Sequence, residues 1–157
     1  MEQVNPKIVP FRFELPLFKP TGAVRLSGRP DIEKGFLVFL DVARALPGMV
    51  RVIPRAGGQK FDWTKKITFH LDLEDLAQWS IFLLDPAPSQ PFVFYRKGLD
   101  QKEKKMTFIK REKQQYVVKT TFGKEEIVLT LLPSDIFLLT QGMKSLIEEM
   151  VWHGIRI

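Results

Sequence analysis

The sequence predicts an α+β fold in which two four-stranded antiparallel β-sheets pack as blades, each followed by an α-helix. Short segments with the apolar and polar alternation of half-buried strands recur along both halves of the 157-residue chain. Each series of strands ends in a segment whose apolar residues recur at helical spacing. Strands in a run followed by a helix favour antiparallel sheets with the helices on one side. We therefore expect a single domain over residues 1–157, with pseudo-repeat halves at about 9–85 and 91–154.

The strand segments of the first half are bounded by proline and glycine. Residues 27–30, Ser-Gly-Arg-Pro, are typical of a turn. One segment is apolar on both faces, which predicts a central strand buried twice, and another shows the most regular alternation in the chain. The predicted strands are residues 9–18, 23–26, 35–45, 49–53 and 61–71, of which 35–45 is the doubly apolar segment and 61–71 the regular one.

The second half repeats this plan. Four short strands are predicted at residues 92–97, 106–112, 115–122 and 125–131. Phe122, Gly123 and Lys124 form a tight hairpin turn between the last two.

A helix is predicted to close each half. Asp72, with Asp75 three residues later, is an N-terminal cap for the first helix, and Ser134 after Pro133 caps the second. The apolar stripe of the first is Leu73, Leu76, Ala77, Ser80, Ile81 and Leu84. That of the second is Ile136, Leu139, Met143, Leu146, Ile147, Met150 and Val151. Two small sheets need less apolar surface than these stripes offer, so we expect homo-oligomers.

The charge favours a polyanionic partner. Lys and Arg outnumber Asp and Glu by 24 to 18, which gives a formal charge of +6. Residues 96–124 hold ten basic and three acidic residues, whereas residues 72–95 hold four acidic residues and no basic one. This segregation predicts a binding face.

Several function classes find no support. The chain has no cysteine, hence no disulfide and no thiolate chemistry. Nucleotide-binding and hydrolase motifs are absent, and neither His70 nor His153 has a partner at metal-ligand spacing. The acidic residues Asp72, Glu74 and Asp75 fit a helix N-terminus better than a divalent-ion site. We expect a binding protein without catalytic residues, metal or cofactor. With no signal peptide and no long apolar stretch, we expect it in the cytoplasm, away from membranes.

Single-strand binding requires Lys and Arg for phosphates and exposed aromatic faces on which bases stack. Both occur on the predicted strands, with the alternative that aromatic residues at every second position belong to the core. The candidate nucleic-acid-binding residues are Lys19, Arg25, Arg44, Arg51, Arg55, Lys60, Trp63, Lys65, Lys66, Phe94, Tyr95, Arg96, Lys97, Lys110, Arg111 and Lys119.

The order of elements, together with three local blocks, resembles the Whirly family of single-stranded-DNA-binding proteins. Residues 61–66, Phe-Asp-Trp-Thr-Lys-Lys, resemble the family's Tyr-Asp-Trp-Ser-Arg-Lys block. Residues 34–40 are similar to its Gly-Phe strand, and residues 131–136 and 151–154 to the two ends of its final helix. Residues 19–26 correspond to the family's Lys-Gly-Lys-Ala-Ala-Leu motif but lack its second lysine.

This resemblance implies sequence-tolerant binding of single-stranded DNA along the sheets, by a tetramer held together through its helices. It suggests a nucleoid-associated protein of replication, repair or recombination. The lack of a transit peptide favours a prokaryotic or viral member. RNA is the competing ligand, and a transcription cofactor or oligomeric scaffold of the same fold is the other alternative.

Overall fold

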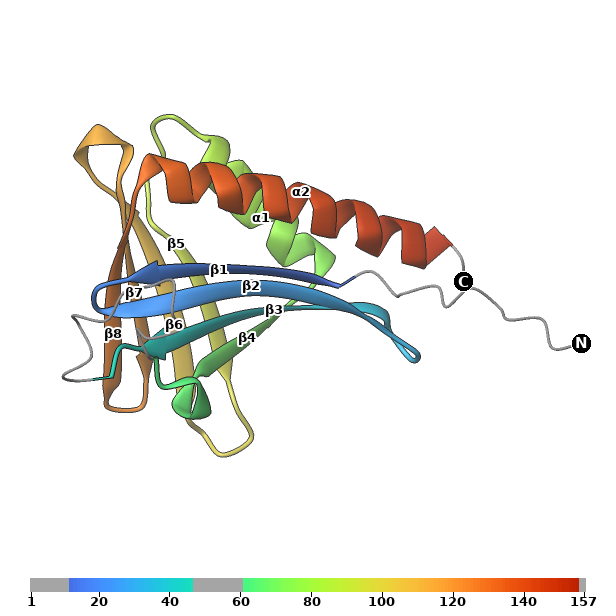
Figure 1. The fold of residues 1–157 in the computed structure, drawn as a ribbon, viewed down its shortest axis with the longest axis horizontal. Coiled ribbons are helices and arrows are strands. Elements are labelled where there is room, and N and C mark those ends of the chain that lie inside the picture. The colour runs from blue at the N-terminus through green and yellow to red at the C-terminus, as the bar shows by residue number, and fades with distance from the viewer. Residues whose placement is uncertain (1–11, 47–60, 156–157) are drawn as a thin grey trace, which may run out of the picture.

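Two four-stranded antiparallel sheets, each followed by a helix, make up the fold (Figure 1). The structure, a computed structural model, describes residues 12–46 and 61–155, with side chains up to Trp152. The first sheet contains β1 (Phe13–Lys19), β2 (Gly22–Asp31), β3 (Gly35–Arg44) and β4 (Ile67–Leu71). The second contains β5 (Phe92–Lys97), β6 (Glu103–Lys110), β7 (Tyr116–Phe122) and β8 (Glu125–Leu131). Within each sheet the strands follow chain order, so the predicted fold class is confirmed.

Helix α1 (Leu73–Leu84) follows the first sheet and α2 (Pro133–Ile155) follows the second. The capping box predicted for α1 is confirmed. The Asp72 carboxylate accepts a hydrogen bond from the Asp75 N–H at 2.8 Å, and the Asp75 carboxylate accepts one from the Asp72 N–H at 3.0 Å. The start of α2 lies one residue before the expected cap, with Pro133 in the first turn, where its missing N–H needs no partner.

One hydrophobic core joins both sheets and both helices. Trp79 of α1 lies against the second sheet, with ring-centroid distances of 5.5 Å to Phe94 and 5.2 Å to Phe108. The strands of the first sheet run across those of the second, and α2 lies along the first sheet (Figure 1). Gly28 of β2 permits this approach, because a Cβ there would come within 2.3 Å of Leu146 Cδ2 on α2.

The open edge of β4 is covered by side chains from the second sheet. The Thr68 carbonyl accepts a hydrogen bond from Lys104 Nζ at 2.5 Å, and the His70 carbonyl accepts one from the Arg96 guanidinium at 3.2 Å. Arg96 also pairs with the Asp75 carboxylate of α1 at 2.8 Å. These contacts satisfy carbonyls that an edge strand leaves without a strand partner.

The edge of β8 is covered in the same way by the first sheet. The Glu126 carbonyl accepts a hydrogen bond from the Arg44 guanidinium at 2.9 Å, and the Val128 carbonyl accepts one from the Thr21 hydroxyl at 2.6 Å. The two halves therefore hold each other by reciprocal contacts.

Two local predictions in the first half are wrong. Residues 27–30 belong to β2, and the turn comes after them, where the Asp31 carboxylate accepts hydrogen bonds from the N–H groups of Glu33 and Lys34. Of residues 61–71, only β4 is a strand, because Trp63–Lys65 form a short 3-10 helix, η2. The Thr64 hydroxyl donates to the Asp62 carboxylate at 2.6 Å and stabilises this turn. The strand expected at residues 49–53 lies outside the described residues.

The buried face of α1 also differs from the predicted stripe. Leu73, Ile81 and Leu84 are exposed, and the large rings of Trp79 and Phe82 are buried in their place. Rings of this size bury more apolar area than leucine or isoleucine, which explains why they face the core.

In the other helix, Val151 is exposed instead of buried. No helix in the described ranges is both long and apolar enough to span a lipid bilayer.

In the second sheet, β6 begins at Glu103 and ends at Lys110, and a 3-10 turn, η3 (Glu112–Gln114), leads into β7.

Candidate nucleic-acid interface

The face of the first sheet that points away from the core carries cations, hydroxyls and aromatic rings. In β2, Arg25, Ser27 and Arg29 lie on this face because Val24 and Leu26 point into the core. The antiparallel register brings outer side chains of β3 and β4 beside them, namely Phe39, Asp41, Thr68 and His70. We call this surface the outer face of the first sheet.

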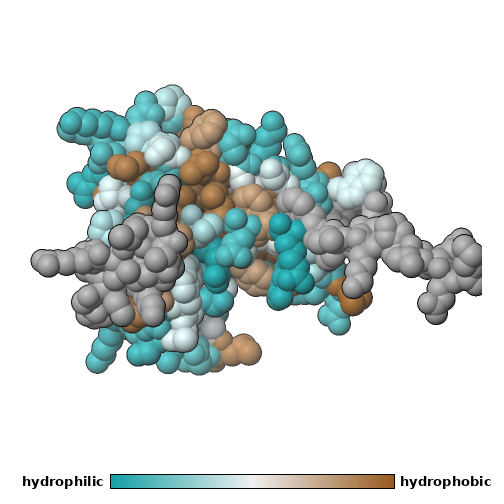
Figure 2. Space-filling model, in the orientation of Figure 1, coloured by the Kyte–Doolittle hydropathy of each residue, from teal (hydrophilic) through white to brown (hydrophobic). Residues whose placement is uncertain are grey.

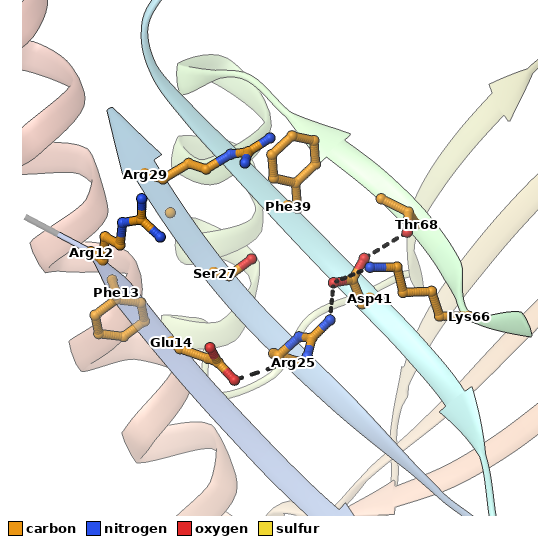
Figure 3. A pocket seen from close by; sticks show the side chains of 11 residues that line it. Arg12, Phe13, Glu14, Arg25, Ser27, Arg29, Phe39, Asp41, Lys66 and Thr68 are labelled. Carbon is orange, nitrogen blue, oxygen red and sulfur yellow. Dashed lines mark hydrogen bonds and ion pairs between the residues drawn. The ribbon is translucent and has the colours of Figure 1, made fainter. Parts of the chain in front are cut away.

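A pocket of about 460 Å³ opens on this face (Figure 3). It is lined by Arg12, Phe13, Glu14, Arg25, Ser27, Gly28, Arg29, Phe39, Asp41, Lys66 and Thr68. Cations outnumber carboxylates in this lining by four to two, so the pocket attracts anions.

At one end of the pocket a buried carboxylate holds the surrounding polar groups in place. Asp41 is only 3% exposed and accepts hydrogen bonds from the Arg25 guanidinium at 3.0 Å and from the Thr68 hydroxyl at 2.6 Å. Lys66 Nζ lies 3.9 Å from the same carboxylate. The Arg25 guanidinium also lies 4.3 Å from the ring centroid of Trp63, in a cation–π contact. Arg25 is therefore fixed, and it covers one face of the Trp63 ring.

At the other end two arginines have no acidic partner in the part of the chain that the structure describes. Phe13 pairs with Gly28, which places Arg12 opposite Arg29, and Figure 3 shows both at this end. No carboxylate of the described residues forms an ion pair with Arg12 or Arg29. The Arg29 guanidinium carbon lies 5.7 Å from the Phe39 ring centroid, and this half-buried ring lies 5.4 Å from His70. Positive charge and an aromatic surface therefore lie side by side, open to solvent.

More aromatic rings continue along this face beyond Arg25. Phe18 is 53% exposed and stacks on Phe61 at 5.3 Å with an interplanar angle of 19°. Phe61 lies 6.4 Å from Trp63 and covers the buried Ala23 and Ala43. The outer face thus offers a series of rings from Phe18 to Phe39.

Several predicted binding residues instead stabilise the fold. The Lys19 ammonium forms an ion pair with Asp135 in the first turn of α2. The Lys110 ammonium donates hydrogen bonds to the carbonyls of Asp85 and Pro86, just beyond the C-terminus of α1. Arg44 and Arg96 cover the strand edges described above.

The outer face of the second sheet carries cations beside the exposed ring of Tyr95. Tyr95 is 47% exposed and lies beside Lys105 in the register. A hydrogen bond to Glu103 raises the pKa of the Tyr95 phenol above its ordinary value of 10.0, and desolvation adds to this rise. Lys119 pairs with Glu126 at 3.4 Å. Lys97 and Lys105 of this sheet form no ion pair with another described residue, so cations and an exposed ring lie together here as well.

The prediction for Phe94 is wrong. Its ring is only 2% exposed and packs among Phe69, Trp79, Phe92 and Phe108, so no base can stack on it.

The remaining predicted cations are exposed. Lys65 and Lys66 flank the end of η2, Lys97 ends β5, and Arg111 follows β6. The predicted residues Arg51, Arg55 and Lys60 lie outside the described residues.

Of the pocket residues, the sequence predicts only Arg25 and Lys66 as binding residues, and those it misses include Arg12, Arg29 and Phe39. Arg29 was assigned to a turn and Phe39 to a strand buried on both faces. The signal that could have found Arg29 is the alternation of Arg25, Ser27 and Arg29 with the apolar residues of β2.

Comparisons with known proteins support the fold. No protein-family model matches the sequence, and no curated protein matches it significantly. Among solved structures, the chain is similar to the plant transcriptional regulator PBF-2, with a TM-score of 0.60 and 17% sequence identity. The match covers 96% of this chain and 96% of that chain. Sequence identity this low shows a shared fold only, and the fold is Whirly-like.

Proposed function

We propose that this protein binds single-stranded nucleic acid, and single-stranded DNA first, across the outer face of the first sheet. The observation that carries this proposal is the open basic pocket in which Arg29 lies beside the Phe39 ring and Arg12 lies opposite Arg29, neither arginine being paired with a carboxylate of the described residues. Phosphates are bound by such cations, and bases stack on such rings. In a duplex the base faces are already stacked on each other, so this surface favours single strands.

Binding is expected to tolerate many sequences. A ring such as Phe39 or Phe18 stacks on any base, because every base has an aromatic face. The polar groups that could read a base edge at the other end of the pocket are already engaged, since Asp41 accepts hydrogen bonds from Arg25 and Thr68. Tyr95, Lys97 and Lys105 of the second sheet are a second, weaker contact surface in this proposal. A fold shared with a plant transcriptional regulator supports a nucleic-acid partner.

We further propose that copies of the chain associate through their helices, with a tetramer favoured, and coat single-stranded DNA. Helix α1 exposes Ile81 (70%) and Leu84, and α2 exposes Phe137 and Leu138. Figure 2 shows apolar surface near the top of this view, where α2 crosses the molecule, between hydrophilic areas. Exposed apolar side chains gathered on helices favour contact with another protein surface. The proposed role is protection of single strands during replication, repair or recombination.

Fluorescence anisotropy with labelled oligo-dT, the matching RNA and a duplex, each at two salt concentrations, tests the proposal. We expect tight binding to dT that exceeds binding to the duplex. The logarithm of the association constant should fall with the logarithm of salt by about 0.7 per phosphate contacted. Preferential binding to RNA would reassign the ligand. Absence of binding to every strand at low salt would contradict the proposal and favour a protein-binding scaffold.

A further inference from the structure

Among the described residues, the basic and aromatic surface of the first sheet extends in one direction only from Arg12 and Arg29. Toward β4 and η2 it continues through Phe39, Arg25 and Trp63, as the contacts above show. In the opposite direction, along β2 and β3, the turn at residues 31–34 follows at once. This turn carries two carboxylates, Asp31 and Glu33, against a single lysine. A strand bound along the surface therefore meets negative charge immediately beyond the two arginines.

The arginine pair also has a charge that suits a doubly charged anion. Arg12 and Arg29 form no ion pair within the described ranges, whereas Arg25 and Lys66 share the carboxylate of Asp41. An internal phosphodiester has one negative charge, and a terminal phosphate monoester has nearly two at neutral pH. Guanidinium groups bind phosphate oxygens through paired, charge-assisted hydrogen bonds. The charge of Arg12 and Arg29 at this end of the surface is therefore complementary to the charge of a terminal phosphate on a nucleic-acid strand.

We propose that the pocket binds the terminal phosphate of a nucleic-acid strand, with Arg12 and Arg29 on the phosphate and Phe39 beneath the terminal base. The ring position supports this, since Phe39 lies between Arg29 and the Asp41 network (Figure 3). The free hydroxyl of Ser27, directly opposite Phe39 in the register, is available for the sugar. This inference rests on the proposed single-strand binding and adds an end preference to it.

The test compares oligo-dT of about six nucleotides in three forms, carrying a 5′-phosphate, a 3′-phosphate or two hydroxyl ends. Each is titrated by anisotropy against the unchanged protein and against the double variant Arg12→Gln/Arg29→Gln. Lys113→Asn is the control for loss of a positive charge away from the pocket, because Lys113 is exposed in the turn after β6 with φ of 59°, a conformation that asparagine tolerates. Melting temperatures of all proteins check that the substitutions leave the fold intact.

We expect one phosphorylated form to bind at least about fivefold more tightly than the hydroxyl form. The double variant should lose this difference, and Lys113→Asn should keep it. Equal binding of all three forms, or a difference that persists in the double variant, would overturn the inference.

Two further results separate this inference from the proposed function. Salt-sensitive binding of every dT form with equal affinity would reject only the end preference.

Competition by thymidine monophosphate or by inorganic phosphate shows whether the pocket recognises the phosphate alone or a strand end. A site for a terminal nucleotide would be supported if low millimolar thymidine monophosphate displaced the phosphorylated strand from the protein and the same concentration of inorganic phosphate did not. Displacement by both at equal concentration would instead show a simple anion site and reject the role of Phe39.

Discussion

Substitution of two phenylalanines tests which surface holds the bases. The alternatives are the outer face of the first sheet, which carries Phe39, and the strand at residues 92–97, where the sequence predicts Phe94 as a binding residue. Phe39 is half-buried on the outer face beside Arg29, and Phe94 is buried in the aromatic core. Removal of a stacking ring weakens single-strand binding by about 1–3 kcal/mol per base, which corresponds to about 5- to 150-fold in Kd. We expect Phe39→Ala to show this loss at a stability cost of about 1 kcal/mol.

Phe94→Ala is the matched control with the opposite expectation. Its ring contacts four other aromatic rings of the core, so deletion leaves a cavity and costs about 3–5 kcal/mol of unfolding free energy. Affinity for oligo-dT, measured per folded molecule, should stay near that of the unchanged protein.

Urea denaturation and anisotropy on the same protein preparations separate the two effects. The reasoning would be refuted if Phe39→Ala stayed folded and bound dT within about twofold of the unchanged protein, since the loss expected from stacking is larger than that. It would also be refuted if Phe94→Ala lost binding under conditions in which its fold is intact.

Three further outcomes are expected. Glu14→Gln removes an exposed carboxylate from the pocket and should raise affinity for dT about twofold at low salt, with a smaller gain at high salt. Gly28→Val should lower the unfolding free energy by about 1–3 kcal/mol in urea titrations, because the new side chain meets Leu146 of α2. Burial, with a smaller contribution from Asp85, raises the pKa of Tyr116 above its ordinary 10.0. The unfolded state therefore loses the phenol proton first, and stability should fall above about pH 10, less steeply in Tyr116→Phe.

The sequence predicted the order of strands and helices because their signals are local. The cap of α1, with Asp72 and Asp75, and the alternation of β8 depend only on neighbouring residues. The turn expected at residues 27–30 is a part of β2 instead, and the reason lies far along the chain. Gly28 is needed because Leu146 lies against it, and no local pattern distinguishes a packing glycine from a turn glycine.

The binding surface was predicted less well than the fold, because a strand residue faces the core or the solvent according to what packs against it. Phe39 and Phe94 both lie in apolar strand segments, and only the packing of α1 and the first sheet, through Trp79 and Phe69, buries Phe94. The clustering of Arg12 with Arg29 requires the pairing of β1 with β2 in register. Composition therefore indicated a polyanion-binding protein, but it could not indicate which face carries the charge.

Positive charge has a structural use in this molecule beside the binding use that we propose, and this affects how mutations are interpreted. Arg44 and Arg96 donate hydrogen bonds to the open edges of β8 and β4, and Arg96 also pairs with Asp75. A substitution at either position leaves an edge carbonyl without its partner. We expect it to weaken the contact between the two sheets and thereby to lower affinity indirectly. Loss of binding in such a variant does not identify a phosphate contact. Arg12 and Arg29 have no such structural partner among the described residues, so their substitution reports on the ligand directly.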